Sequence, residues 1–348
     1  MKFIHFGCWN EYGCNLINSK TPLSKVMRLL NNYIQNHKIK FIDIAGDNNY
    51  PEYLTSKSNS KKLNANKFFS GYDCLPKNIK KYIIFGNHDI EDKMIIDDLN
   101  LNLIKTKINL STNPFNKDNN CNSLDLQYLY TALDPSYKIF SDVIYKIYHK
   151  TMIIMIDTTI LTNLKNLSSL ECYTKIFKNF PINQKLSQEN LIKYQLDCVR
   201  NIIIKYPDIK NYIFIGHHPI FFCKKSNHSA FITITKDKII NFFIQITDIL
   251  KDKYIYYLCA DSHYYQSSII NINNLIINQY IVGTGGAHPE KIDFDYMIKN
   301  KQTYQEKNIL NNKISYQILN HKNEYGFLVI NIKSLDNIDN IKFKFINI

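Results

Sequence analysis

Several features are missing from this chain of 348 residues, and each absence narrows the classes of function that remain open. No apolar run approaches the roughly 20 residues that a membrane-spanning helix needs, so we expect no membrane partner. No Arg-rich run or basic helix with interleaved aromatic residues is present, and a nucleic-acid partner is unsupported although the net charge is +13. The lysines are scattered, and we interpret their charge as a general attraction for anionic, phosphorylated substrates.

The chain also lacks the cysteine patterns of zinc fingers and of disulfide-rich secreted domains. Its 8 cysteines form no C-x-x-C pair and no dense framework. Scattered along a chain of this length, they predict reduced thiols in an intracellular, cytoplasmic protein. The first six residues already enter a strand that carries a motif, which leaves no room for a signal peptide before it and favours the same setting.

Four apolar runs of strand length each end in small residues and side chains that bind metals. The runs occupy residues 41–45, 82–85, 211–215 and 254–259. The sequences that follow them are G-D-N-N-Y, G-N-H-D, G-H-H-P and A-D-S-H. A single His or Asp in a loop usually bonds to the backbone. Because loops at the carboxyl ends of strands gather at one edge of an α/β sheet, four such ends together predict a metal site at that edge.

The types of side chain at these strand ends favour particular metals and a particular reaction. Carboxylate, imidazole and amide ligands together suit zinc, iron or manganese better than calcium, which takes oxygen ligands. One carboxylate, such as Asp47, can bridge two ions about 3.5–4 Å apart, a spacing that stabilises both oxygens of a phosphoryl displacement. His88 and His218 each follow a predicted ligand and are placed to donate a hydrogen bond or a proton to the substrate.

The order of these motifs resembles the calcineurin-like metallophosphoesterase superfamily, and G-D-x-x-Y and G-H-H-P resemble its purple-acid-phosphatase-like branch. Residues 7–9 stand where that branch has G-D-W, and residues 156–158 resemble its I-D-T strand. Gln195 opens a helix similar to the one before its G-H-x-P strand, and residues 283–286 resemble its late glycine turn. The resemblance implies a four-layer α/β/β/α sandwich of two mixed β-sheets flanked by helices. We expect a single domain over residues 1–348, with a variable insertion around residues 91–145.

The same resemblance implies a site that holds two divalent or trivalent ions of zinc, iron or manganese, with Asp47 between them. One ion would also be held by Tyr50, His263 and the residue at position 8, and the other by Asn87, His217 and the residue at position 261. The implied activity is the hydrolysis of phosphate monoesters by attack of a metal-bound hydroxide, with His88 and His218 as catalytic residues. The predicted metal ligands are Cys8, Asp47, Tyr50, Asn87, His217, Asp261 and His263.

Two of these ligands depart from the family pattern. Position 8 carries Cys where the family has Asp, and position 261 carries Asp where the family has His. A thiolate suits zinc and tends to reduce ferric iron, so Cys8 argues against a stable pair of Tyr50 with Fe(III). Cys8 is either a ligand or a small buried thiol, and both interpretations stay open. We expect Asp261 to be a ligand, because His263 keeps the spacing of the motif.

These departures leave two hypotheses of function. The first is a metal-dependent phosphoesterase, which we favour because Cys8 and Asp261 are themselves able to bind metals. The alternative is a catalytically impaired pseudophosphatase that serves as a binding or structural protein. The physiological substrate and the oligomeric state are not predictable from the sequence.

The apolar pattern also predicts the elements around the site. An amphipathic helix is expected at residues 23–37, and further helices are expected at residues 186–206 and 239–250. Residues 52–80 are expected to form a polar loop and a short helix over the site, and residues from 314 onward alternate as strands.

Overall fold

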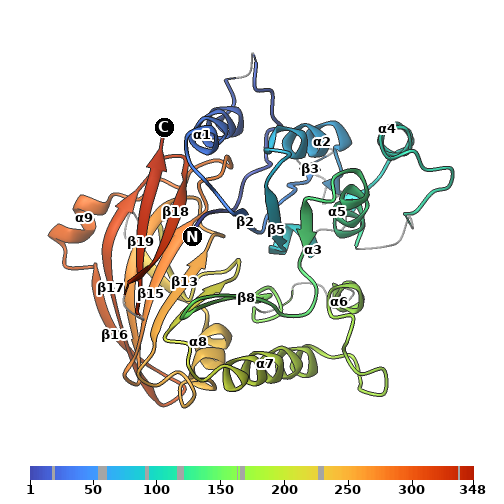
Figure 1. Cartoon of the computed structure of the whole chain (residues 1–348). Coiled ribbons are helices and arrows are strands. Elements are labelled where there is room, and N and C mark those ends of the chain that lie inside the picture. The colour runs from blue at the N-terminus through green and yellow to red at the C-terminus, as the bar shows by residue number, and fades with distance from the viewer. Residues whose placement is uncertain are drawn as a thin grey trace.

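The computed structural model describes residues 1–17, 20–53, 61–90, 94–115, 121–162, 164, 169–225, 231–335 and 338–348. Two large mixed sheets pack face to face, and helices cover their outer faces (Figure 1). This arrangement is the four-layer α/β/β/α sandwich, and the fold prediction is confirmed.

The first sheet has a parallel centre and an antiparallel edge. Strands β1, β2, β5 and β7 run parallel, β18 pairs antiparallel with β1, and β19 pairs antiparallel with β18. In order across the sheet, the strands are β19 (Ile338–Asn347), β18 (Gly326–Leu335), β1 (Lys2–Phe6), β2 (Phe41–Ala45), β5 (Lys80–Ile84) and β7 (Tyr137–Ile139). Every residue of β2 is buried, as expected for a β-branched run in the middle of a covered sheet.

The second sheet repeats this plan with β9, β10, β13 and β15 as its parallel centre. In order across the sheet, its strands are β16 (Tyr304–Ile309), β17 (Asn312–Lys322), β14 (Tyr265–Ile272), β15 (Leu275–Val282), β13 (Tyr254–Cys259), β10 (Asn211–Ile215), β9 (Thr151–Met155) and β8 (Ile144–Tyr148). Aromatic rings join the two sheets: Phe343 of β19 stacks on Tyr280 of β15 at 4.2 Å, and Phe345 stacks on Tyr265 of β14 at 4.3 Å. The inner faces therefore form one shared core.

Helices lie on the outer side of each sheet (Figure 1). Those beside the first sheet are α1 (Pro22–Asn36), α2 (Ala65–Cys74), α4 (Asp98–Ile108) and α5 (Asn122–Leu133). Those beside the second are α7 (Gln188–Lys205) and α8 (Asp237–Ile244). The short helices are α3 (Asn87–Ile90), α6 (Leu170–Ile176) and α9 (Phe294–Lys299). Two small sheets complete the described part: β3 (Glu52–Tyr53) with β4 (Lys61–Lys62) and β6 (Met94–Ile95), and β11 (Phe221–Lys225) with β12 (Phe231–Thr235).

The helices at residues 23–37 and 186–206 form within two residues of the predicted ends. The third predicted helix is shorter than expected, because α8 ends at Ile244 rather than at residue 250. Beyond it, the backbone N–H groups of Ile246 and Thr247 each donate to the carbonyl three residues earlier, so tighter turns replace the α-helical hydrogen bonds. The Thr247 hydroxyl also donates to the Phe243 carbonyl at 3.0 Å.

Two further segments differ from or extend the expectation. The helix within residues 52–80 is α2, and it buries Phe68, Phe69 and Tyr72 in the core instead of forming a polar cover. Residues 54–60 of that segment lie outside the described residues. The segment around residues 91–145 contributes α4, α5 and β7 at one edge of the first sheet, and its residues 91–93 and 116–120 are likewise not described.

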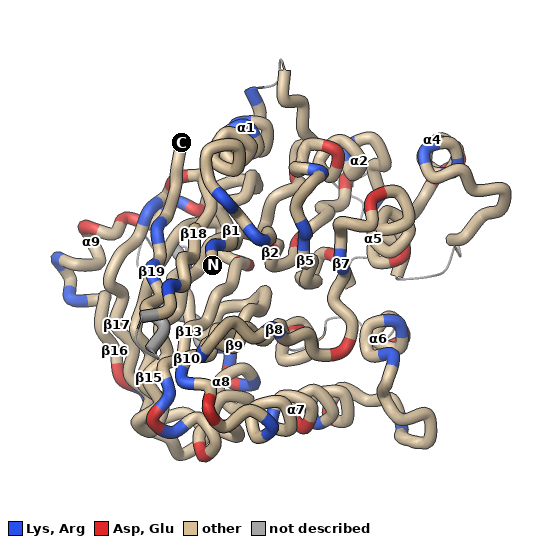
Figure 2. The backbone as a smooth tube through the Cα atoms, viewed as in Figure 1, with Lys and Arg blue, Asp and Glu red and all other residues tan. Residues whose placement is uncertain are grey.

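Charged residues are spread over both sheets and their helices, and basic and acidic positions are interspersed (Figure 2). None of the helices in the described part of the chain combines the length and the apolar character that a bilayer-spanning helix requires.

Four of the cysteines form two disulfides, Cys14–Cys74 and Cys121–Cys172, and the prediction of reduced thiols was wrong for them. The partners lie 60 and 51 residues apart in the sequence, so no local spacing reveals them. Disulfides persist mainly in oxidising surroundings, so the cysteines no longer support the expectation of a cytoplasmic setting.

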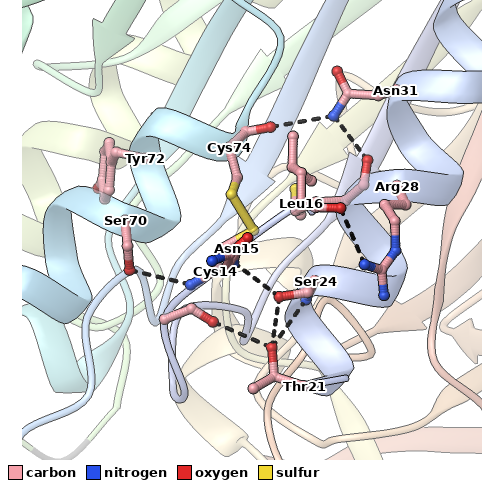
Figure 3. Close-up of a disulfide and its surroundings, with 12 residues drawn as sticks. Cys14, Asn15, Leu16, Thr21, Ser24, Arg28, Asn31, Ser70, Tyr72 and Cys74 are labelled. Carbon is pink, nitrogen blue, oxygen red and sulfur yellow. Dashed lines mark hydrogen bonds between the residues drawn. A yellow bond between two sulfur atoms is a disulfide. The ribbon is translucent and has the colours of Figure 1, made fainter. Parts of the chain in front are cut away.

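The first disulfide fastens the segment that follows β1 to the end of α2 (Figure 3). The backbone N–H of Cys14 donates to Ser70 Oγ at 3.1 Å, and Asn31 of α1 donates to the Cys74 carbonyl at 3.2 Å. The disulfide and these hydrogen bonds together connect α1, α2 and the loop after β1, which also carries Cys8.

Candidate metal centre

The predicted ligands lie where the carboxyl ends of the two parallel strand sets meet. The ends of β1, β2 and β5 face those of β9, β10 and β13 across the boundary between the sheets. Within the first sheet, Cys8 N donates to the Gly46 carbonyl at 3.1 Å. Between the sheets, a ring nitrogen of His217 lies 2.6 Å from the Ala45 carbonyl. The site is therefore assembled from loops of both sheets, rather than from one sheet edge as predicted.

Three candidate ligands leave their strands through a left-handed backbone. The φ angles of Cys8, Asp47 and Asp261 are 51°, 52° and 60°. This conformation costs an ordinary residue roughly 1–2 kcal/mol, and residues held in it gather at functional sites. A close approach explains one motif glycine: a Cβ on Gly86 would lie 2.3 Å from Asp47 Oδ1. The left-handed turns therefore place the candidate ligands close together, and the absence of a side chain at Gly86 leaves room for the Asp47 carboxylate.

One group of candidate ligands surrounds Asp47 Oδ2. Ligand atoms of Cys8, Asp47 and His263 all lie within 4.8 Å of one another. Cys8 Sγ is 3.8 Å from Asp47 Oδ2, and the Tyr50 hydroxyl donates to the same oxygen at 3.2 Å. Tyr50 also lies 3.2 Å from His263 Nε2. The four residues expected around one ion are thus adjacent.

A second group lies on the side of Asp47 Oδ1. His217 Nε2 is 3.3 Å from this oxygen and 3.7 Å from Asp261 Oδ1. A ring nitrogen of His218 falls within 4.8 Å of the ligand atoms of His217 and Asp261. Asn87 begins α3, and the next backbone N–H, that of His88, donates to Asp47 Oδ1 at 3.2 Å. The two oxygens of Asp47 therefore face two different groups of ligands.

The ring nitrogens and the buried amide fit a metal in this position. His217 Nδ1 lies 2.6 Å from the Ala45 carbonyl, and His263 Nδ1 lies 2.7 Å from the His288 carbonyl. Because a carbonyl only accepts, each Nδ1 carries the hydrogen and each Nε2 is left for a ligand, the arrangement usual for metal-binding histidines. Within the described residues, Asn87 Oδ1 is buried and has no hydrogen-bond partner, and His217 Nε2 is buried with only the Asp47 and Asp261 carboxylates beside it. Buried polar atoms are rarely left so unless an ion or water completes them.

The charges of the site are strongly coupled. Burial alone would raise the pKa of Asp47, but the charges of His217 and His88 outweigh it and hold this pKa well below its ordinary value. Burial likewise opposes protonation of His217, yet Asp47 raises the pKa of His217 to about 9. Burial, followed by the charges of Asp47 and Asp261, raises the pKa of the Cys8 thiol well above its ordinary value. A cation in place of the His217 proton would compensate both carboxylates.

The two predicted catalytic histidines occupy different surroundings. His88 is partly exposed, and its ring packs on the Tyr50 ring at 4.8 Å. His218 is only 3% exposed, and its ring lies 4.7 Å from that of His217. The position of His218 suits the predicted contact with substrate. It also suits metal binding, a role that the sequence did not suggest.

Two supporting residues were not recognised from the sequence. Thr158 Oγ1 accepts the backbone N–H groups of His217 at 2.9 Å and His218 at 2.8 Å, and so fixes the G-H-H-P turn. Asp89 is fully buried and accepts hydrogen bonds from Gly86 N at 2.9 Å and Gln127 Nε2 at 2.8 Å, as well as from Asn48. Thr158 belongs to the I-D-T segment and Asp89 to the G-N-H-D motif, and membership of these motifs was the sequence feature that could have revealed them.

Comparison with known proteins identifies the family. A sequence profile described as calcineurin-like phosphoesterase matches residues 1–265, which include every candidate ligand. The chain belongs to this family. The family implies divalent or trivalent metal ions, in agreement with the arrangement of ligands. No curated protein matches the chain.

Three solved structures are similar in outline to this member of the calcineurin-like family. GAP50, the anchor in the inner membrane complex of Plasmodium, has a TM-score of 0.47 and 12% identity, covering 100% of this chain and 84% of its own. The purple acid phosphatase PPD1 from yellow lupin (Lupinus luteus) seeds has a TM-score of 0.49 and 10% identity, covering 95% of this chain and 49% of its own. A Vps29 mutant from Entamoeba histolytica has a TM-score of 0.24 and 7% identity, with 100% coverage of both chains.

Proposed function

We propose that the protein is a metal-dependent phosphoesterase of the purple-acid-phosphatase-like type that hydrolyses phosphate monoesters at this centre. The observation that carries the proposal is the position of Asp47. Its Oδ2 faces Cys8 and Tyr50, and its Oδ1 faces His217, so one carboxylate adjoins two groups of metal-ligating atoms. A bridging carboxylate of this kind is the basis of two-metal phosphoryl transfer.

The two ions would be zinc, iron or manganese. When bound, they would neutralise phosphoryl charge and make water a nucleophile at neutral pH. With Asp47 shared, one ion would be held by Cys8, Tyr50 and His263, and the other by Asn87, His217 and Asp261. A thiolate at position 8 favours zinc for the first ion.

The two histidines beside the ligands would donate a proton to the leaving group and a hydrogen bond to the phosphoryl group. His88 is packed on Tyr50 and partly exposed, which suits donation of a proton to the leaving oxygen. His218 would hydrogen-bond a phosphoryl oxygen. Its backbone is held on both sides, since its N–H donates to Thr158 and its carbonyl accepts the Tyr257 hydroxyl at 2.5 Å. Fixed donors of this kind stabilise developing charge without reorganisation.

A second candidate is a pseudophosphatase, a binding or structural protein on the same fold. The observation that favours it is the cluster of Asp47, His217 and Asp261, in which a protonated imidazole lies 3.3 Å and 3.7 Å from the two carboxylates. Such an ion pair can neutralise a buried carboxylate without a metal. The replacement of the family's His by Asp261 makes this arrangement possible.

The metal content and the activity of the same preparation separate the two candidates. Protein purified without chelator should hold about one to two equivalents of zinc, iron or manganese and should hydrolyse p-nitrophenyl phosphate. Asp47→Asn should lose most of both metals and the activity, whereas the control Asp197→Asn, at an exposed position on α7, should lose neither. A metal content below about a tenth of an equivalent after metal-supplemented expression would support the pseudophosphatase.

A further inference from the structure

A cavity of about 480 Å³ adjoins the metal centre, a volume within the range of small-molecule sites. Glu11, Tyr12, Glu52 and Lys67 line its outer part, and Tyr50 and His88 line the part next to the centre. None of these outer residues was recognised from the sequence, because they lie in the loop after β1, in β3 and in α2, outside the family motifs.

In the proposed reaction, the cavity lies on the side of the leaving group. It shares Tyr50 with the ligand group around Asp47 Oδ2, and it shares His88, to which proton donation to the leaving oxygen is assigned above. An ester whose phosphoryl group lies at the centre, with its leaving oxygen toward His88, would therefore extend its alcohol portion into this space.

The charge of the cavity is opposite in sign to that of the chain. Two carboxylates, of Glu11 and Glu52, face one ammonium group, that of Lys67, although the whole chain carries +13. Each charged group is positioned by a neighbouring element. Glu11 Oε2 accepts the backbone N–H of His288 at 2.6 Å, and Glu52 Oε1 accepts Asn64 Nδ2 at 2.8 Å. Lys67 Nζ donates to the Tyr50 carbonyl at 2.6 Å. Hydrogen bonds thus fix the positions of both carboxylates in the lining of the cavity.

We propose that this cavity binds the alcohol portion of the substrate and that Glu11 and Glu52 select phosphate monoesters whose alcohol carries a protonated amine. This inference rests on the proposed phosphoesterase function. An ammonium group forms strong charge-assisted hydrogen bonds with carboxylates, whereas an anionic alcohol portion meets like charge. In the reaction, water provides the oxygen that bonds to phosphorus, the bond from phosphorus to the alcohol oxygen breaks, and His88 protonates that oxygen. The products are inorganic phosphate and an amino alcohol.

Three esters of equal chain length test the selection: O-phosphoethanolamine with an ammonium group, ethyl phosphate with none, and phosphoglycolate with a carboxylate. The measured quantity is the ratio of kcat/KM for the ammonium ester to kcat/KM for each of the others. Because the esters differ in intrinsic reactivity, this ratio is compared between the wild type and the variants Glu11→Gln and Glu52→Gln. The intrinsic reactivity of each ester is the same for both proteins and cancels in this comparison, so the change in the ratio measures the contribution of the carboxylate that was replaced.

The expected result is a fall of about tenfold in the preference for O-phosphoethanolamine in each variant, the lower end for a hydrogen bond between charged groups. The control Glu306→Gln, on the exposed edge strand β16, should leave the ratio unchanged. Ratios that stay the same in both cavity variants, while all three esters are hydrolysed, would overturn the selection and leave the phosphoesterase function standing. If metal-loaded wild type hydrolyses neither these esters nor p-nitrophenyl phosphate, the proposed function fails and the selection fails with it.

Discussion

Removal of the Cys14–Cys74 disulfide should destabilise the protein by an amount that the chain length between the two cysteines determines. The bond closes a loop with a sequence separation of 60, for which the loss of chain entropy in the unfolded state amounts to about 4 kcal/mol at 25 °C. The double variant Cys14→Ala/Cys74→Ala should lose about this free energy of unfolding. In urea the midpoint should fall by about 1 M or more, since the dependence on urea is a few kcal/mol per M.

The native contacts of the segment predict a local effect in addition. Asn10, in the loop after β1, donates to the Phe68 carbonyl at 3.2 Å, and Cys14 N donates to Ser70 Oγ at 3.1 Å. Once the disulfide is absent, these bonds and the packing of Trp9 on Tyr72 at 5.2 Å still connect the loop to α2, but no covalent link remains between them. Because this loop contains the candidate ligand Cys8, we expect the variant to bind metal more weakly than the wild type does.

Urea unfolding of the oxidised wild type and the double variant, followed by circular dichroism, measures the difference. Cys198→Ala is the matched control, since Cys198 is a half-buried thiol on α7, and it should change stability by no more than about 1 kcal/mol. Equal midpoints for the double variant and the wild type would refute the reasoning. So would a mass spectrum of the native protein in which Cys14 and Cys74 both react with an alkylating reagent before reduction.

Three further outcomes follow from the centre. Metal affinity, measured by competition with a chromophoric chelator, should rise at least about tenfold per pH unit between pH 6 and 8. Asp47 raises the pKa of His217 to about 9, and the metal must displace at least that proton; an affinity independent of pH would contradict this. If Cys8 is a ligand, chelator should expose it to alkylation, and an equal rate with and without metal would make it a bystander. Loss of the imidazole in His88→Ala or in His218→Ala should lower kcat for p-nitrophenyl phosphate by about 10²–10⁴-fold, and full activity in both variants would refute their roles.

The motif-bearing strands were predictable because their signals are local. β2 and β10 are short β-branched and aromatic runs, buried along their whole length and followed at once by Gly. The order of the four loop motifs was enough to predict the family and the four-layer fold. Local patterns led to errors at α8, where i→i+3 turns replace the last turns of the expected helix, and at α2, whose aromatic face is buried in the core.

The candidate ligands were likewise named from the sequence, but their mutual arrangement depends on long-range contacts. Tyr50 lies 3.2 Å from His263 although 213 positions separate them, and no local pattern contains that distance. Only the packing of two sheets decides that opposite oxygens of Asp47 face different groups.

The disulfides and the cavity show the same limit. Cys14 and Cys74 meet because α2 packs beside the loop after β1, and Glu11, Glu52 and Lys67 meet because three separate elements border one space. Local propensity and periodicity determined which strands and loops this chain forms. How those elements pack sets which residues distant in sequence come together, and only the tertiary structure decided this packing.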